Sequence, residues 1–373
     1  MIFPKYPGLI QREILDDMNN LDLLLLSLVS KNMKKLVSSS QNKRFRNIRS
    51  IEYEYDRTDG TCVVYLLDQS KPLKEYYKQE SRTVDDIIMR IIEHTKAGKD
   101  SNQLNVSGKL IDFRLSDDYK YPVASYLEYD KESVFQSIHN HFLDVFGNSI
   151  EYNWEEPRWE DSKDFFIPFI PKLKNVSFCI GLYLDEQFSD VRNFENFFSL
   201  SPVAKLIQMK VHKKMKPLNP ESKFYQAESI YIHTWKINGP DFVRHFRGRQ
   251  ICVDCDRYEK ENVIDFVKRW KSGEAFQNLE YSSINPRGDN QFSPRLLIEI
   301  GAKFIDGNKQ PPKFDVRQRF DWYDKDTTVY LPPSYAYVVR KTDNRVASVE
   351  VQYGTFFIGV WAETEEEFLK MVK

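Results

Sequence analysis

Residues 6–31 read YPGLIQREILDDMNNLDLLLLSLVSK, and this stretch decides how the chain begins to fold. Pro7 suits the first turn of a helix, and apolar residues recur after it at helical spacing: Leu9, Ile10, Ile14 and Leu15. The Asn19-Asn20 pair interrupts this apolar face. We therefore predict a second helix that opens near Asp22 and a short third helix that carries Met33, Leu36 and Val37.

This helical segment holds more leucines than a unit of its size can enclose. A piece of about forty residues buries only a modest share of its surface, so we expect another chain or the rest of the molecule to cover part of it. The polar run at 38–42 marks the predicted boundary. We predict a helical domain at 1–42 and a larger domain at 43–373.

Further local signals predict three more helices. Thr83 is expected to cap a helix whose buried face carries four isoleucines: Ile87, Ile88, Ile91 and Ile92. An amphipathic helix is expected to begin near Glu132 and to stop at Gly147. Near the carboxyl end, Thr364 and Glu367 match a capping box that opens a terminal helix.

Alternating runs predict antiparallel strands in two places. Residues 49–55 and 61–67 flank Asp59-Gly60, a pair typical of hairpin turns. Later, three alternating runs separated by turn residues predict a meander: 335–340, 345–351 and 355–361. We therefore expect a hairpin and helices at 43–175, and the meander with its terminal helix at 320–373.

Between these parts, residues 176–305 alternate strands with helices. Strands are expected at 176–182, 206–212, 228–235, 250–254 and 278–282, and helices at 191–200, 240–246, 259–270 and 294–304. Strands joined through helices should run parallel, and their starts recur roughly every 20 to 30 residues, as in leucine-rich-type solenoids. The predicted fold is α+β/α/β: a three-helix unit, a leucine-rich-repeat-like solenoid and an antiparallel meander.

Apolar and polar residues alternate in these strands, which predicts one open face of the sheet. If Ile230 and Ile232 point to the core, the open face carries six residues that we predict to bind a protein substrate: Gln208, Lys210, His212, Tyr231, His233 and Trp235. The alternative is that a loop or the meander covers the aromatic residues, because aromatic side chains are usually packed.

Composition and charge predict an ordered globular chain without a nucleic-acid or membrane partner. The 54 basic and 55 acidic residues nearly cancel, so no global field favours polyanions. The longest apolar run, at 21–29, is far shorter than the roughly 20 residues that cross a bilayer. Because the 4 cysteines are scattered and no secretory leader is evident, we expect a cytoplasmic or nuclear protein.

No motif in the sequence predicts catalysis, a metal site or a cofactor. Cys252 and Cys255 form a CxxC without a second ligand pair, and this spacing on a strand turns them to opposite faces. His139 and His141 do not face each other on a helix, so we interpret them as solvated or capping side chains. The GxSxG, HExxH, GxxxxGKS/T and GxGxxG motifs are absent, which lowers the expectation of an enzyme.

The opening segment resembles an F-box. That family's pattern has a Leu-Pro opening, an Ile-Leu pair, an apolar stop, an Asp-Leu-Leu run and a Val-Ser-Lys close. The matching positions here are Pro7, Ile14-Leu15, Met18, Asp22-Leu23-Leu24 and Val29-Ser30-Lys31. The departures are Tyr6 where leucine is usual, Gly8 after the proline, and Met33 where tryptophan is common.

Later motifs look like the type 2 F-box-associated domain of the large nematode-type F-box family. They are the helix end at 266–273, the following Leu279-Glu280-Tyr281, and the closing runs at 337–341, 347–349 and 356–361. The F-box and the associated domain stand in the expected order, and the resemblance covers most of the chain.

This resemblance implies a non-catalytic substrate-recognition subunit of a Skp-cullin-F-box ubiquitin ligase, without a metal or cofactor. Its helices would bind a Skp-type adaptor and through it a cullin, and its larger domain would bind an unknown protein substrate. The residues expected to contact or support the adaptor are Pro7, Leu9, Ile10, Ile14, Leu15, Leu24 and Leu28. Two alternatives stay open: an interaction module no longer coupled to the ligase, and an enzyme whose site no local motif reveals.

Overall fold

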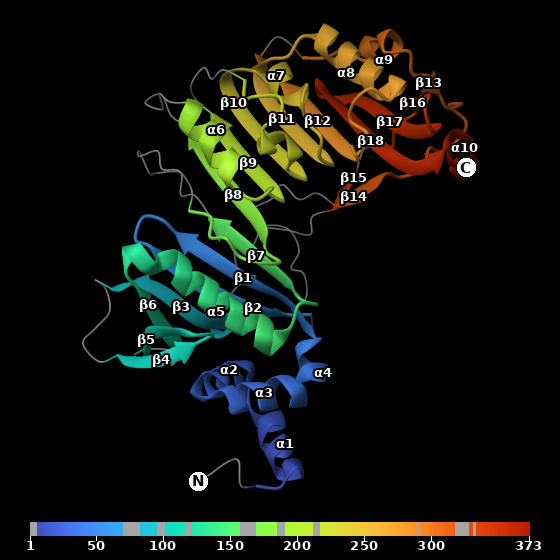
Figure 1. Ribbon diagram of the computed structural model, residues 1–373. Coiled ribbons are helices and arrows are strands. Elements are labelled where there is room, and N and C mark those ends of the chain that lie inside the picture. The colour runs from blue at the N-terminus through green and yellow to red at the C-terminus, as the bar shows by residue number, and fades with distance from the viewer. Residues whose placement is uncertain are drawn as a thin grey trace. The chain divides into compact units, whose positions relative to one another are not determined.

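The computed structural model describes residues 6–69, 83–94, 101–116, 121–156, 169–184, 191–211, 217–288, 291–317, 328–330 and 333–373. The chain divides into two compact units. Unit 1 takes in the chain up to residue 157 together with 168–178, and unit 2 takes in 158–167 and 179–373. In Figure 1 the colour runs from blue to green through unit 1 and on to red through unit 2.

Four helices open unit 1: α1 (Gly8–Asp17), α2 (Asn20–Val29), α3 (Lys31–Ser40) and α4 (Asn42–Phe45). The first three confirm the predicted helices. However, α2 begins at the asparagine pair, because the side chain of Asn19 caps it by accepting a hydrogen bond from the N–H of Asp22 at 2.8 Å. The helix α3 continues to Ser40, within the run at 38–42 that was expected to mark the boundary. The domain limit at residue 42 stays a prediction.

The rest of unit 1 is a mixed sheet with one long helix across it (Figure 1). The strand order is β7-β1-β2-β3-β6-β5-β4, in which β1 pairs with β7 and β3 with β6 in parallel. The helix, α5 (Lys131–Phe146), ends at Gly147 as predicted. The strands are β1 (Ile48–Asp56), β2 (Thr61–Asp68), β3 (Ile87–Glu93), β4 (Asn102–Val106), β5 (Lys109–Leu115), β6 (Pro122–Tyr126) and β7 (Glu151–Glu156), and β1 with β2 forms the predicted hairpin.

The helix predicted after Thr83 is wrong. Thr83 and Asp86 do form a capping box, with both donors of Thr83 at 2.9 Å from Asp86 Oδ2, but it closes only a 3-10 turn at Val84–Asp86. The isoleucines that follow lie in β3, which is buried on both faces between β2 and β6. Burial on both faces removes the alternation that marks a strand, so the apolar run resembled a helix face. This explains why β3 was not predicted; β4 to β7 were not predicted from the sequence either.

One hydrophobic core joins the helices and the sheet of unit 1. Leu23 and Leu24 of α2 belong to the same cluster of buried side chains as Phe135 of α5 and Trp154 of β7. The Trp154 ring stacks on the ring of Tyr55, with 5.6 Å between their centroids. The rest of the unit therefore covers much of the leucine-rich surface that the short helices cannot enclose.

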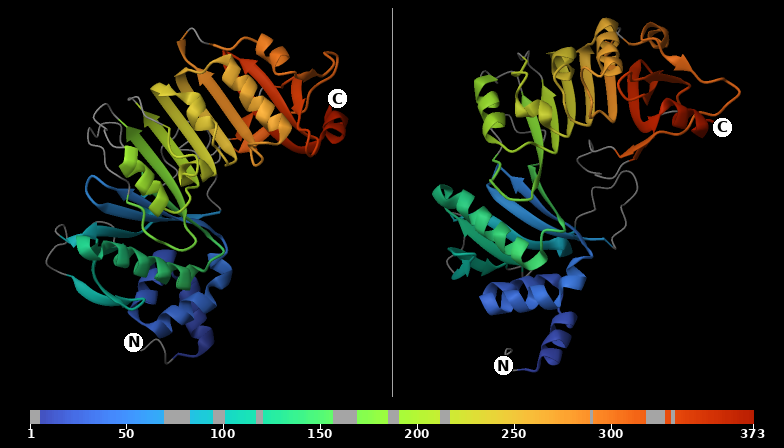
Figure 2. Two further views of the ribbon diagram at one scale, coloured as in Figure 1. Left: turned by 45° about the horizontal axis from the view of Figure 1, so that its top comes forward. Right: turned by 45° about the vertical axis from the view of Figure 1, so that its right-hand side comes forward.

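The five predicted parallel strands are present: β8 (Ser177–Leu184), β9 (Leu206–Val211), β10 (Ser229–Asn238), β11 (Gln250–Arg257) and β12 (Tyr281–Pro286). They belong to unit 2 except for the first two residues of β8, and β12 begins three residues later than predicted. Between them lie α6 (Val191–Leu200), the 3-10 turn η5 (Lys223–Gln226), α7 (Gly239–Val243) and α8 (Lys260–Ser272). Figure 2 shows these helices on one face of the sheet. Ile207, Ile230 and Ile251 are fully buried in neighbouring strands, which confirms the predicted core face.

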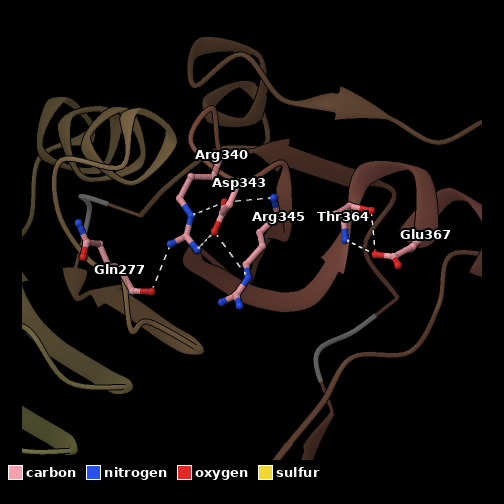
Figure 3. Close-up of polar contacts among 6 residues, drawn as sticks. All are labelled: Gln277, Arg340, Asp343, Arg345, Thr364 and Glu367. Atoms are coloured by element: carbon pink, nitrogen blue, oxygen red, sulfur yellow. Dashed lines mark hydrogen bonds and ion pairs between the residues drawn. The ribbon is translucent and has the colours of Figure 1, made fainter.

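Antiparallel strands continue the sheet of unit 2 beyond β12, in the order β12-β18-β17-β16-β13. Three of them form the predicted meander: β16 (Ala336–Val339), β17 (Arg345–Gln352) and β18 (Thr355–Thr364). The other elements are α9 (Arg295–Glu299), β13 (Lys303–Phe304), the hairpin of β14 (Asp315–Arg317) with β15 (Thr328–Tyr330), and α10 (Glu365–Met371). The predicted capping box of Thr364 and Glu367 opens α10 (Figure 3).

Unit 2 is thus a large mixed sheet with helices, and the leucine-rich-repeat-like solenoid stays a prediction. The face opposite the helices is not open throughout. Leu206, Cys252 and Tyr281 lie on it and are buried in a second cluster with Phe314 and Trp361. At these positions the sheet face is covered, as in the alternative that a loop or the meander packs on it. Apolar side chains from further along the chain, such as Phe314 and Trp361, pack on this face and exclude water.

Candidate functional site

The predicted adaptor residues fall into two groups. Pro7, Leu9 and Ile10 at the start of α1 are exposed, with 77% of Leu9 and 45% of Ile10 accessible to solvent, and Ile14 is half-buried. The other three are buried in the core of unit 1: Leu15, Leu24 and Leu28. Exposed apolar side chains can bind a partner without unfolding the domain, whereas the buried leucines hold the helices together.

One exposed apolar residue of these helices was missed by the sequence reasoning. Val29, the last residue of α2, is 69% exposed, although it continues an apolar run. Ser30 ends that helix and caps α3 by accepting a hydrogen bond from the N–H of Met33. The available signal was the position of Val29 directly before Ser30, a residue type that often caps a helix. A residue at the end of a helix has fewer neighbours than one in its interior, so its side chain is more exposed.

Polar contacts connect α5 with α2 and α3. Lys34 of α3 forms an ion pair with Asp144 of α5. Nε2 of His141 lies 2.8 Å from Oγ of Ser27, and both residues are buried. The Ser27 hydroxyl already donates to the carbonyl of Leu24 at 2.6 Å, so His141 is the donor of this hydrogen bond.

The interpretation of His139 and His141 as solvated is therefore wrong. His139 is buried like His141, and its Nε2 lies 2.7 Å from the carbonyl oxygen of Lys174. Because a carbonyl can only accept, Nε2 carries the proton, and Nδ1 accepts from the hydroxyl of Tyr53 at 2.8 Å. Both histidines satisfy buried polar groups, which a helical spacing by itself does not reveal.

The structure places four of the six predicted substrate residues side by side. Tyr231 pairs with Gln208, and His233 with Lys210, in the parallel register of β10 and β9. All four side chains are half-buried on the face opposite the helices. His212 and the side chain of Trp235 lie outside the described residues.

Polar contacts organise this face. The hydroxyl of Tyr231 donates to Asp254 Oδ2 at 2.9 Å, and a terminal nitrogen of Arg287 lies 3.0 Å from Nδ1 of His233. Burial, followed by the charge of Arg287, lowers the pKa of His233, so this imidazole is neutral near pH 7 and accepts the Arg287 hydrogen bond. The neighbouring Lys210 and Arg287 supply positive charge, and Asp254 supplies negative charge, in a small surface area.

The described part of the opening segment folds into four helices. Several of its leucines are buried between these helices and the rest of unit 1, whereas the apolar side chains at the start of α1 are exposed. A small docking domain requires this arrangement. An F-box domain is found at residues 7–45. No curated protein and no solved structure matches the chain. The F-box assignment rests on a match that ends with α4.

The three departures from the F-box pattern differ in their surroundings. Tyr6 is exposed, and a Cβ added at Gly8 would meet no atom within 4 Å, so both positions lie at the surface. Met33 is buried in α3. The departure at Met33 therefore bears on the packing of the F-box domain, and the departures at Tyr6 and Gly8 bear on its surface.

The buried histidine beneath the F-box domain predicts a dependence of stability on pH. Burial, aided by the charge of Lys34, lowers the pKa of His141 from 6.5 to about 4. Between these values the unfolded chain binds more protons than the folded one, so stability is lost as the pH falls through this window, by about 3 kcal/mol in all. Burial raises the pKa of Glu156 to about 7, and this group acts in the opposite sense, because its stability contribution is lost as the pH rises.

A comparison of variants isolates the histidine. The free energy of unfolding of the wild type, minus that of His141→Gln, is expected to fall by about 3 kcal/mol from pH 7 to pH 4 when both are measured by urea denaturation. Glu156 cancels in this difference, because both chains contain it. Parallel stability curves for the two chains would show that His141 does not change its protonation on unfolding.

The cysteine pair behaves as its spacing predicts. Cys252 lies in the cluster on the face opposite the helices, whereas Sγ of Cys255 approaches Gly239 of α7 on the other face. Among the residues that the structure describes, no group of three or more histidine, cysteine, aspartate or glutamate side chains could hold a metal ion. No helix in the described ranges is long and apolar enough to span a membrane.

Proposed function

We propose that this chain is the substrate-recognition subunit of a Skp-cullin-F-box ubiquitin ligase. The observation that carries the proposal is the F-box domain at residues 7–45, because F-box domains bind Skp-type adaptors within these ligases. Leu9 and Ile10 support it, since large apolar side chains that stay exposed on a folded unit mark an interaction surface. The cullin would be reached through the adaptor.

This role requires no catalytic group in the chain. F-box proteins are generally non-catalytic adaptors, and no catalytic family is indicated. The chemistry of ubiquitin transfer would take place in partner proteins, and this chain would supply proximity and orientation of the substrate. Such a subunit would act in the cytoplasm or the nucleus.

The proposed substrate-binding part is unit 2. Gln208, Lys210, Tyr231 and His233 offer aromatic and polar groups on one partly accessible face, a composition that suits protein recognition. We keep His212 and Trp235 in the same proposal. The finer assignment, a nematode-type protein with a type 2 F-box-associated domain and a solenoid-like parallel region, is likewise a proposal.

Direct binding tests the proposed function. The purified full chain is expected to bind a purified Skp-type adaptor with a dissociation constant of about 1 μM or tighter, measured by isothermal titration calorimetry. Absence of binding by a folded wild-type chain would contradict the proposal. It would favour an interaction module that is no longer coupled to the ligase, with Tyr6 and Gly8 as the altered surface positions.

A further inference from the structure

Unit 2 contains a surface groove of about 500 Å³ where the parallel strands begin. Glu228, Arg249 and Glu280 line it from the residues just before β10, β11 and β12, and Arg345 and Trp361 line it from β17 and β18. We call it the edge groove. It differs from the part of the sheet face that carries Tyr231 and His233, because neither of these residues lines it. Its size falls within the range of about 300–1,000 Å³ that is typical of ligand sites.

The charges on one side of the edge groove are already paired. One terminal nitrogen of Arg249 lies 3.3 Å from Glu228, and the other contacts Glu280. Two carboxylates thus share the guanidinium of Arg249, and Arg247, which also lines the groove, is paired with Glu221. Both arginines on this side are engaged by carboxylates, so this side offers little compensation for a ligand with a double negative charge.

Arg345, another lining residue of the edge groove, interacts with Asp343, which also binds Arg340 (Figure 3). The guanidinium of Arg340 donates hydrogen bonds to both carboxylate oxygens of Asp343. Its Nε lies 2.9 Å from Oδ1, and a terminal nitrogen lies 2.6 Å from Oδ2. Arg340 is buried, and its guanidinium carbon lies 5.3 Å from the centre of the Trp270 ring. The same side chain donates to the carbonyl of Gln277 at 3.3 Å, which ties this turn to another lining residue of the groove.

Because Asp343 binds mainly to Arg340, the guanidinium of Arg345 remains available to bind a ligand. Its Nε lies 3.6 Å from Asp343 Oδ2, a longer separation than the hydrogen bonds that Arg340 makes to the same carboxylate. Among the described residues, the two terminal nitrogens of Arg345 have no hydrogen-bond partner, and the side chain is 46% exposed. Figure 3 shows these nitrogens pointing away from Asp343. A guanidinium held at Nε presents its terminal pair as a fork that matches a carboxylate.

We propose that the edge groove binds an acidic side chain in an extended segment of the protein substrate, with Arg345 as the anchor. This inference rests on the proposed function as a substrate receptor. Gln226 also lines the groove and offers an amide group for the peptide backbone. The paired carboxylates of Glu228 and Glu280 favour a singly charged carboxylate over a phosphate group.

A positional-scanning library of octapeptides tests this inference on the purified full chain. The wild type is expected to enrich aspartate and glutamate at one position about tenfold over asparagine and glutamine, because a charge-assisted pair is lost in the amide peptides. Arg345→Gln is expected to lose this enrichment. The matched control is Arg295→Gln, which removes an exposed arginine of α9 outside the edge groove and should keep it.

The same preparations separate this inference from the proposed function. Arg345→Gln should bind the Skp-type adaptor as the wild type does, since Arg345 is not part of the F-box domain. Equal selection of acidic and amide peptides by the wild type, or unchanged acidic enrichment in Arg345→Gln, would overturn the edge-groove inference and leave the adaptor result standing. Stronger enrichment of phosphoserine than of glutamate would overturn the assignment of a carboxylate.

Discussion

The variant Leu9→Asp with Ile10→Asp is expected to bind a Skp-type adaptor at least about 100-fold more weakly than the wild type. Both side chains are exposed at the start of α1, so in the complex they would be buried against the partner. An aspartate at either position would then lose its hydration without gaining a partner, which is costly. Isothermal titration calorimetry with the purified adaptor measures the effect.

A matched variant in unit 2 controls for charge and for lost apolar surface. Leu200 and Val203 are 80% and 45% exposed, close to the values of Leu9 and Ile10. Leu200→Asp with Val203→Asp adds the same charge and should leave adaptor binding unchanged. Both double variants should keep the wild-type free energy of unfolding within about 0.5 kcal/mol per site, since surface changes are usually mild. Full adaptor binding by the α1 variant would remove these residues from the proposed interface.

Replacement of Trp154 by alanine is expected to destabilise unit 1 by about 3–5 kcal/mol. The ring is fully buried in β7, where it stacks on Tyr55 and meets the edge of Phe135 at 5.4 Å. Removing it leaves a cavity in the core that also holds the F-box leucines. Hydrogen exchange of the α5 amides reports this loss, because their slowest exchange follows the opening of the core.

The conservative variant Trp154→Phe separates ring packing from polar effects. Nε1 of Trp154 has no hydrogen-bond partner among the described residues, so phenylalanine removes no satisfied polar group. We expect a loss below about 1.5 kcal/mol, since most of the ring volume is kept. A loss as large as that of the alanine variant would show that the indole N–H has a partner, such as a buried water.

The sequence identified candidate adaptor-binding residues in the F-box segment, but it did not distinguish the exposed ones from the buried ones. Leu9, Ile10 and Leu24 fit the same helical pattern and the same family pattern. Only the packing of α2 against the sheet of unit 1 separates Leu24, which is buried, from Leu9 and Ile10, which are exposed. That sheet comes from residues more distant in the chain, and a local pattern contains no information about such contacts.

The edge groove was not predicted for the same reason. Arg340, Asp343 and Arg345 are close in sequence, and a turn between strands was expected there. However, Arg340 is fixed by Gln277, 63 residues away, and by the ring of Trp270 in α8. Only these distant contacts make Arg340 the main partner of Asp343 and leave the fork of Arg345 available.

The sequence by itself determined many local elements: the stop of α5, the capping box of α10, the turn of the first hairpin, and the alternating runs that form strands in unit 2. These depend on residues within a few positions of one another, such as Thr364 with Glu367. Tertiary structure alone decided that the isoleucines after Thr83 form a strand, that His139 and His141 are buried, and that later side chains cover part of the second sheet face. Burial depends on neighbours that are distant in the chain, and the free energy of excluding water outweighs local preference at those positions.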